Sequence, residues 1–186
     1  AQPFSEQFDR ITTDDAAAGR MAAEHLLARG HQRLGFVGAV VEAGVAGDFG
    51  TTNLDGFRQT LALAGVPLPD AYVSLDAFGL EQARRQAQHL LDLPQPPTAI
   101  YAASDTQAIG VISAVRERGL DVPDDVAVMG FDDIEIAEFI GLTTIGQPLK
   151  AAGRQAVELL LARLAEDERP VQHLELPLTV RQRATT

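Results

Sequence analysis

The chain has 186 residues, no cysteine, a net charge of −11 and a sequence pI near 4.7. The lack of cysteine excludes disulfides and thiol chemistry, and the acidic charge opposes a nucleic-acid-binding surface, which needs clustered Lys and Arg. No apolar run approaches the ~20 residues of a membrane span, and the length favours one large domain or two small lobes. Residues 1–10 are polar, without the apolar core of a signal peptide, and the missing initiator methionine leads us to expect a piece of a longer chain.

After an extended or disordered lead at residues 1–9, apolar runs of strand length alternate with helical apolar periods. Strands are expected at residues 10–13, 33–41, 72–75, 98–103, 126–131, 142–146, 171–176 and 178–181. Helices are expected at residues 14–28, 53–64, 79–93, 105–118, 134–140 and 149–165. This alternation indicates parallel βαβ units with right-handed crossovers, so the expected fold class is α/β with a mostly parallel sheet.

Two of the expected strands end at polar pairs. Residues 98–103 lead into Ser104–Asp105, and residues 126–131 lead into Asp132–Asp133. The carboxyl ends of parallel strands meet at one edge of the sheet, where the ligands of open α/β sheets bind. Either member of the first pair can cap the helix that follows.

Several interpretations of Asp132–Asp133 are open. The pair can cap the turn after Phe131, act as an acid/base pair or half a metal site, or present one carboxylate to a polyhydroxylated ligand. Adjacent side chains at a strand end point in different directions, so both carboxylates need not reach one ligand. Of the two, Asp132 has the position for a ligand contact.

A catalytic constellation is not visible in the sequence. Ser104 as a nucleophile would need a positioned base, but no histidine lies near it in the chain. The four histidines, His25, His31, His89 and His173, are scattered. We therefore expect a binding protein rather than an enzyme, with no cofactor and no resident metal.

Residues 42–50 are rich in glycine, with Gly44, Gly47 and Gly50. A phosphate cradle built from backbone N–H groups is one interpretation, and a mobile loop at the mouth of a cleft is the other. No Gly-Lys-Ser/Thr follows and the Gly-x-Gly-x-x-Gly spacing is absent, which favours the loop.

Five motifs, in order and at family spacing, resemble the lactose/galactose-repressor (LacI/GalR) family of transcription regulators. They are Gly30–Gly38, Asp55–Phe57, Pro97–Asp105, Gly119–Asp133 and Leu142–Pro148. The resemblance covers nearly all of residues 10–183 and concerns the effector-binding region, which is similar to periplasmic sugar-binding proteins. It implies a three-layer αβα lobe of the type I periplasmic-binding-protein-like fold, with part of a second similar lobe.

The resemblance also implies a division of the chain. Residues 10–29 would end an N-terminal lobe, 30–145 would form the C-terminal lobe, 146–168 would return to the N-terminal lobe, and 169–183 would be closing strands of the C-terminal lobe. Family members carry a helix-turn-helix before this region, so the chain would be truncated at its N-terminus. The implied function is a cytoplasmic sensor that binds an effector between two lobes and acts on DNA through the missing helix-turn-helix. The rival function is a sugar-binding transport receptor of the periplasmic type.

Carried over by position, the family's ligand contacts fall on Asn53, Ser104, Asp132 and Gln147. The position of the family's aromatic wall falls on Phe78 or else on Ala77. Asn53 stands where the family usually has arginine, so an anionic ligand would lose its bidentate partner. Ser104 stands where sugar binders often have asparagine. The expected effector is a small polar molecule, a sugar or a related metabolite.

The family dimerises through its C-terminal lobe, and the matching positions include Ile109 and Phe139. An isologous pair of chains would bury both residues; the alternative is that both belong to the ordinary core. Separately, the helices at 14–28 and 149–165 carry apolar stripes that would face an N-terminal-lobe sheet mostly absent from this chain. We therefore expect a homodimer rather than an isolated monomer.

Overall fold

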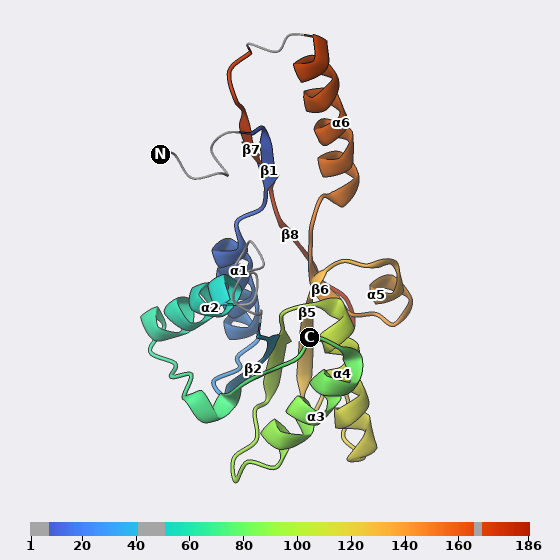
Figure 1. Ribbon diagram of the computed structural model, residues 1–186. Coiled ribbons are helices and arrows are strands. Elements are labelled where there is room, and N and C mark those ends of the chain that lie inside the picture. Colours follow the sequence, from blue (N-terminus) through green and yellow to red (C-terminus); the bar gives the residue numbers. More distant parts are fainter. Residues whose placement is uncertain (1–7, 41–50, 166–168) are drawn as a thin grey trace. The chain divides into compact units, whose positions relative to one another are not determined.

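The computed structural model of the protein describes residues 8–40, 51–165 and 169–186 (Figure 1). The chain divides into two compact units, which are described separately here. Unit 1 comprises the described residues of Ala1–Asp14 together with Gln147–Leu178, and unit 2 comprises Asp15–Gly146 with Thr179–Thr186. The Gly-rich segment 42–50 and most of the expected lead lie outside the described residues.

Unit 2 is built on a six-stranded sheet in the order β3-β2-β4-β5-β6-β8. Neighbouring strands are parallel except for the antiparallel pair of β6 and β8 at the edge. The strands are β2 (Leu34–Ala39), β3 (Val73–Asp76), β4 (Ala99–Ala102), β5 (Ala127–Asp132), β6 (Thr143–Gly146) and β8 (Thr179–Arg181). The helices are α1 (Asp15–Ala28), α2 (Thr51–Leu63), α3 (Leu80–Leu91), α4 (Asp105–Glu117) and α5 (Glu135–Phe139), with a 3₁₀ turn at Asp70–Tyr72. The α/β prediction with a mostly parallel sheet is confirmed.

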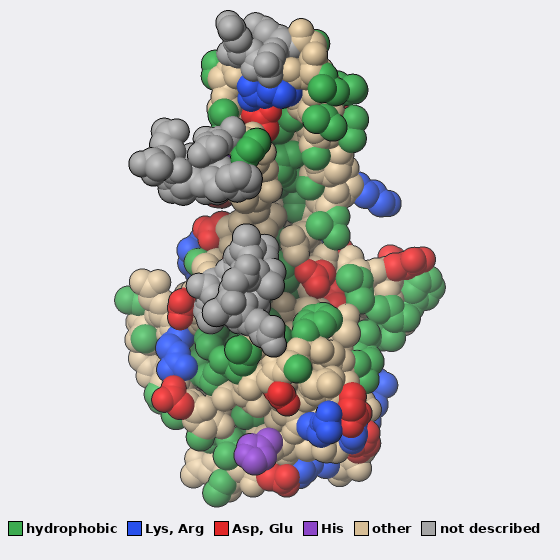
Figure 2. Space-filling model, viewed as in Figure 1, with side chains coloured by type: hydrophobic (Ala, Val, Ile, Leu, Met, Phe, Trp, Pro, Cys, Tyr) green, Lys and Arg blue, Asp and Glu red, His purple; other side chains and the backbone are tan. Residues whose placement is uncertain are grey.

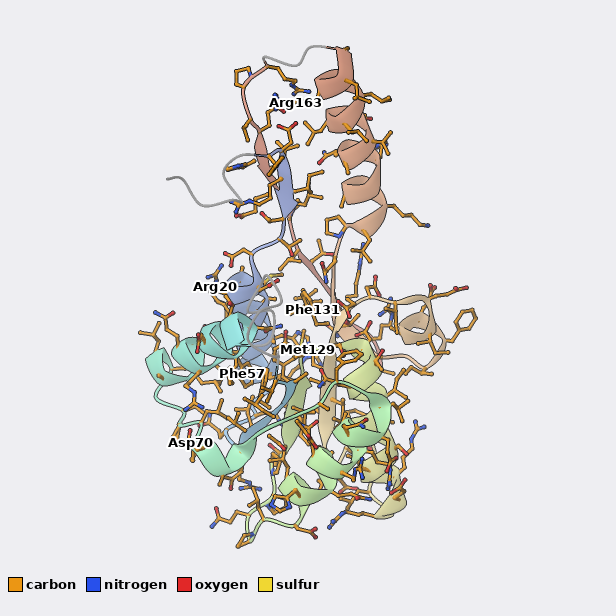
Figure 3. All side chains as sticks on the ribbon, in the orientation of Figure 1. Arg20, Phe57, Asp70, Met129, Phe131 and Arg163 are labelled. Carbon is orange, nitrogen blue, oxygen red and sulfur yellow. The ribbon has the colours of Figure 1, made fainter. Side chains whose placement is uncertain are left out.

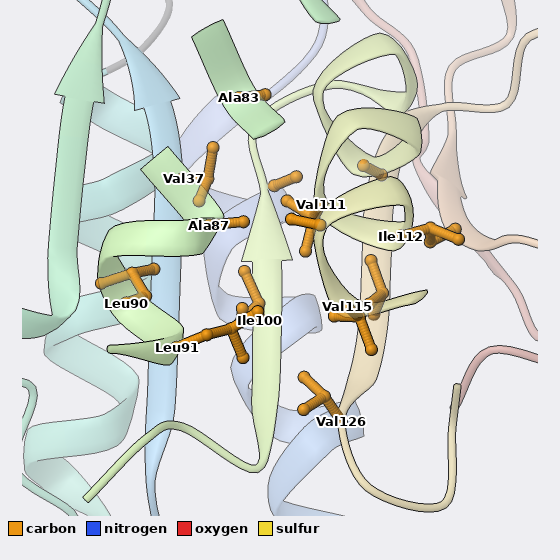
Figure 4. Close-up of a cluster of buried hydrophobic side chains, with 14 of the residues drawn as sticks. Val37, Ala83, Ala87, Leu90, Leu91, Ile100, Val111, Ile112, Val115 and Val126 are labelled. Atoms are coloured by element: carbon orange, nitrogen blue, oxygen red, sulfur yellow. The ribbon is translucent and has the colours of Figure 1, made fainter. Parts of the chain in front are cut away.

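Helices cover both faces of this sheet, giving unit 2 three layers (Figure 1). On one face α3 and α4 lie over a cluster of fully buried apolar side chains, among them Val37 and Ile100 of the sheet and Val111 of α4 (Figure 4). On the other face Phe57 of α2 packs against the rings of Phe36 and Tyr101, at centroid distances of 6.0 and 5.2 Å (Figure 3). Successive side chains of β2 and of β4 therefore point to opposite faces of the sheet and belong to two separate cores.

The helices α1 and α2 touch backbone to backbone. A Cβ atom added to Gly19 would lie 1.9 Å from the carbonyl oxygen of Asn53, and one added to Gly56 would lie 2.0 Å from that of Ala16. The buried face of α1 consists of Ala18, Gly19, Ala22, Ala23 and Leu26. The helix therefore lies with unit 2, which differs from the expected division that placed it with the other lobe. The expectation that its apolar stripe lacks a partner is wrong, because α2 covers it.

Unit 1 contains β1 (Arg10–Thr12), α6 (Leu149–Ala165) and β7 (His173–Glu175). β1 and β7 pair in parallel, with Ile11 opposite Leu174. The expected closing segment 169–183 is thus divided, because β7 joins β1 while only β8 joins the large sheet. Pro177 lies between the two strands and has no N–H to continue a ladder, which separates them.

A salt bridge of 2.9 Å between Arg163 of α6 and Asp9 ties the helix to the strands of unit 1 (Figure 3). A groove of about 860 Å³ lies between α6 and the segment from Phe8 to Ile11. Hydrophobic side chains remain exposed along α6 (Figure 2), with Leu164 at 75% exposure. Every helix of the described residues is too short or too polar to cross a bilayer.

Candidate ligand-binding site

The parallel strands of unit 2 end together at one edge of the sheet, and the candidate site lies there. Ser104 follows β4, Asp132 ends β5, and the backbone of Asp132 is paired with Gly146 at the end of β6. This is the edge at which open α/β sheets bind their ligands. The sequence-based placement of Ser104 and Asp132 on neighbouring strand ends agrees with the structure, because β4 and β5 are adjacent and parallel.

Ser104 caps α4. Its hydroxyl oxygen accepts a hydrogen bond from the backbone N–H of Gln107 at 3.2 Å, and the hydroxyl also contacts the side-chain oxygen of Gln107 at 3.2 Å. The predicted cap is therefore confirmed for Ser104. Gln107 is buried, and its side-chain N–H₂ group has no hydrogen-bond partner in the described part of the chain. The hydroxyl of Ser104 is thus already bonded to Gln107 at the start of α4, and a ligand that binds it would have to do so in addition to these contacts.

The turn after β5 has an unusual backbone. Asp132 has φ = 120° and Asp133 has φ = 59°, and these are the non-glycine residues with positive φ among those described. Such conformations cost about 1–3 kcal/mol each and concentrate at binding sites. The N-cap of α5 is Ile134, whose side chain makes no capping hydrogen bond. Neither aspartate of the pair therefore occupies the N-cap position of that helix.

The two carboxylates of this turn have different environments. Asp133 accepts a hydrogen bond from Arg183 at 2.7 Å and lies 3.6 Å from Arg181. Asp132 is half-buried at the strand end. Within the described ranges no three His, Cys, Asp or Glu side chains converge on a common point as metal ligands would. The carboxylate of Asp133 therefore links the turn to β8 and to Arg183 just after it, while Asp132 lies at the carboxyl edge of the sheet.

Asp105 joins the end of β4 to this same turn. One carboxylate oxygen accepts from the hydroxyl of Thr144 at 2.6 Å, and the other accepts from the backbone N–H of Ile134 at 2.9 Å. Its side chain is completely buried, and burial raises the pKa of the carboxyl despite these hydrogen bonds. A Cβ atom on Gly130 would lie 2.2 Å from this carboxylate, so residue 130 of β5 must be glycine for the strand to lie this close to Asp105. The sequence pointed to Asp105 as a helix cap and missed this connection.

Asn53 is held by Tyr101. The hydroxyl of Tyr101 donates to the side-chain oxygen of Asn53 at 2.8 Å, and both residues are buried. Burial raises the pKa of the Tyr101 hydroxyl, and the nearby negative charges of Asp132 and Asp105 raise it further. Tyr101 is therefore a neutral donor. Sequence reasoning missed it, although a tyrosine inside an apolar strand signals that its hydroxyl needs a partner.

The remaining predicted contacts, Phe78 and Gln147, follow two other strands, β3 and β6. Phe78 is 62% exposed in the loop after β3, which is separated from β4 by β2. Gln147 directly follows Gly146 and belongs to unit 1. The structure thus joins Asn53, through Tyr101, to β4, whose neighbour β5 carries Asp132. The loop of Phe78 is separated from β4 by one strand and from β5 by two.

The residues expected at a dimer interface lie on α4 and α5. Ile109 and Ile140 line the same hollow of about 440 Å³. Phe139 is 78% exposed, so it is not part of the core, and Ile136 beside it is 44% exposed. Hydrophobic side chains also gather over α5 in the space-filling view (Figure 2).

Comparison with known proteins gives a consistent assignment. Residues 23–186 match the periplasmic binding protein-like domain. The HTH-type transcriptional repressor CytR of Escherichia coli (strain K12) is 36% identical over 165 residues, which are 87% of this chain and 47% of CytR. The chain thus spans about half the length of the curated relatives it matches.

Two solved structures are similar to the chain. The transcriptional regulator CelR in complex with cellobiose has a TM-score of 0.85 and 30% identity, covering 97% of this chain and 55% of CelR. A LacI family transcriptional regulator from Enterococcus faecium with bound ribose has a TM-score of 0.84 and 28% identity, covering 96% of this chain and 65% of that one. Because the domain match spans most of the sequence, the chain belongs to the periplasmic binding protein-like domain family, in the form found in LacI-family transcription regulators.

Proposed function

We propose that the chain is the effector-sensing part of a cytoplasmic LacI-type transcription regulator, and that its effector is a carbohydrate. The ligand would bind at the carboxyl edge of the sheet in unit 2. The observation that carries this proposal is the strained turn that ends β5 in Asp132. Strain of this kind persists where the surrounding structure holds it for a function.

The chemistry of this edge suits a neutral, hydroxyl-rich ligand. The carboxylate of Asp132 can accept hydrogen bonds from sugar hydroxyls, and such charge-assisted bonds are strong. Asn53 supplies no positive charge, and its side-chain oxygen is already bonded to Tyr101. The two similar structures that carry cellobiose and ribose support the carbohydrate class.

The role in regulation, rather than transport or catalysis, is proposed from the relatives. CytR and the ribose operon repressor are named as repressors. The hydroxyl of Ser104 is hydrogen-bonded to Gln107 and the carboxylate of Asp105 to Thr144 and Ile134, which is not a nucleophile–base pair. Binding would then shift a population of conformations that a DNA-binding part reads. A second copy of the chain would dock on α4 and α5 through Ile109 and Phe139.

The sugar proposal is tested by the melting temperature of the whole protein with D-ribose and with cellobiose, followed by isothermal titration. Ribose 5-phosphate is the matched anionic control. A neutral sugar should raise the melting temperature and the phosphate ester should not. A rise with the phosphate ester alone, or with no carbohydrate of a broader panel, would contradict the proposal.

The regulatory part is tested by the upstream coding sequence. A helix-turn-helix encoded upstream of this region, before the remainder of the N-terminal lobe, supports the regulator. A secretion signal there would contradict it and support the transport receptor.

A further inference from the structure

Arg183 clamps the turn after β5 from the side of β8. One guanidinium nitrogen donates to the carboxylate of Asp133 at 2.7 Å, and another donates to the carbonyl oxygen of Leu142 at 2.8 Å. The backbone N–H of Arg183 donates to the hydroxyl of Thr143 at 2.9 Å. Two side-chain bonds and one backbone bond thus fix the position of this residue, and the planar fork of arginine suits the two side-chain bonds.

The same turn is held from the opposite side by Asp105. Its buried carboxylate accepts from the N–H of Ile134 and from the hydroxyl of Thr144, so the backbone just after Asp133 is also fixed. The positive φ values of the turn therefore lie between two independent anchors, one on its backbone and one on its side chain.

We infer that Arg183 is a positioning residue of the candidate site, which holds Asp133 so that the carboxylate of Asp132 keeps a fixed orientation toward the ligand. The inference rests on the proposed function for its ligand, but the clamp itself can be measured without one. A carboxylate that is already oriented loses less freedom when it binds, which increases affinity. Without Arg183 the turn would relax toward conformations of negative φ, which most residues prefer.

The clamp is tested by hydrogen–deuterium exchange of the whole protein, read by mass spectrometry in peptides. The variants are Arg183→Gln and Arg183→Lys, with Arg58→Gln as the control, because Arg58 forms its ion pair with Asp70 elsewhere on unit 2. Arg183→Gln should speed exchange of peptides containing Ile134 by at least about tenfold while peptides from β4 stay unchanged. Arg183→Lys should give an intermediate rate, and the control should change neither.

Unchanged exchange at Ile134 would overturn the inference. Equal acceleration in the turn and in β4 would also overturn it, because Arg183 would then serve only the stability of the sheet. With a sugar that binds the wild-type protein, Arg183→Gln and Asp133→Asn should each weaken binding about tenfold, and the double variant should weaken it no further. If no sugar binds the wild type, the proposed function fails, while the exchange rates still decide whether the clamp exists.

Discussion

The hydroxyl of Tyr101 and the side-chain oxygen of Asn53 are hydrogen-bonded at 2.8 Å, with both residues removed from water. The bond joins the central strand β4 to α2 inside a cluster of aromatic rings. At the position where the family usually carries a cation, this chain thus has an amide that is held from within. The pair explains how a tyrosine can occupy the middle of a strand that is otherwise apolar.

Tyr101→Phe should therefore destabilise unit 2 by about 1–3 kcal/mol, because it leaves a buried acceptor without its donor. Tyr72→Phe is the matched control, since the hydroxyl of Tyr72 donates to the carbonyl of Gln95 near the surface, where water can replace it. Urea unfolding measures both. Equal losses of unfolding free energy in the two variants would show that the buried hydrogen bond of Tyr101 stabilises the protein no more than the exposed one of Tyr72.

Asp132→Asn should weaken sugar binding by about 1.5–3 kcal/mol in isothermal titration, since a charge-assisted hydrogen bond is replaced by a neutral one. Asparagine tolerates positive φ at least as well as aspartate does, so the turn should keep its shape. Asp124→Asn at an exposed position is the control. Unchanged affinity of the Asp132 variant would remove this residue from the site.

Gly19→Ala should unfold or severely destabilise unit 2, because its new methyl group would lie 1.9 Å from the carbonyl oxygen of Asn53. Gly153→Ala in α6 is the opposite case, since nothing lies within 4 Å of its added Cβ. That variant should stabilise its helix by up to about 1 kcal/mol through the higher helix propensity of alanine. Thermal unfolding compares the pair, and a mild effect at Gly19 would mean that α1 and α2 can move apart.

Phe139→Asp should split the proposed dimer without unfolding the protein, because Phe139 is 78% exposed in the single chain. Ile109→Asp should split it as well, although Ile109 is half-buried and its variant needs a check of folding by circular dichroism. Leu63→Asp, at an 84% exposed position on α2, should leave the dimer intact. Sedimentation velocity gives the result, and a wild-type protein that stays monomeric at about 100 µM would refute the dimer.

The contribution of His25 and His31 to stability should fall as the pH is lowered from about 7.5 to about 5.5, whereas Asp105, whose pKa is raised by burial, acts in the opposite direction. Burial lowers the pKa of His25 and of His31 below the usual 6.5, and the charge of Arg29 adds to this. As the pH falls through 6.5, the unfolded chain takes up protons that the folded protein does not, so the folded state loses stability. The free energy of unfolding, measured with urea at each pH, should depend less steeply on pH in the variant with both His25→Gln and His31→Gln. His89→Gln is the control on the exposed surface, and an equal slope in both variants would exclude this cause.

Local pattern predicted most of the elements of the fold. The apolar run before Ser104 and the glycine stop at Gly119 gave β4 and α4 almost to the residue, because strand length, caps and φ > 0 stops are properties of neighbouring residues. The carboxyl edge could also be predicted, since parallel strands must end on the same side.

Pairing between distant segments could not be predicted from such patterns. Arg183 lies 50 residues from Asp133, and nothing in its surroundings distinguishes it from the exposed arginines. The strands β7 and β8 read as one broken strand, yet they enter different sheets. The helix α1 was assigned to the wrong neighbour, because an apolar stripe predicts that a helix is covered but not what covers it.

Unit 2 consists of two stretches of chain separated by Gln147–Leu178, so its sheet cannot be completed in one continuous step of synthesis. The N–H of Val128 donates to the carbonyl of Thr185, and β8 pairs with β6, so residues Thr179–Thr186 complete a sheet whose other strands end by Gly146. A ribosome makes the chain from its amino end, and it must finish Gln147–Leu178 before this last strand emerges. Until then the nascent chain carries β6 as an open edge, which can pair with the edge of another chain. A sheet that has not yet received Thr179–Arg181 is therefore more open to edge-to-edge pairing with another chain than the finished sheet is.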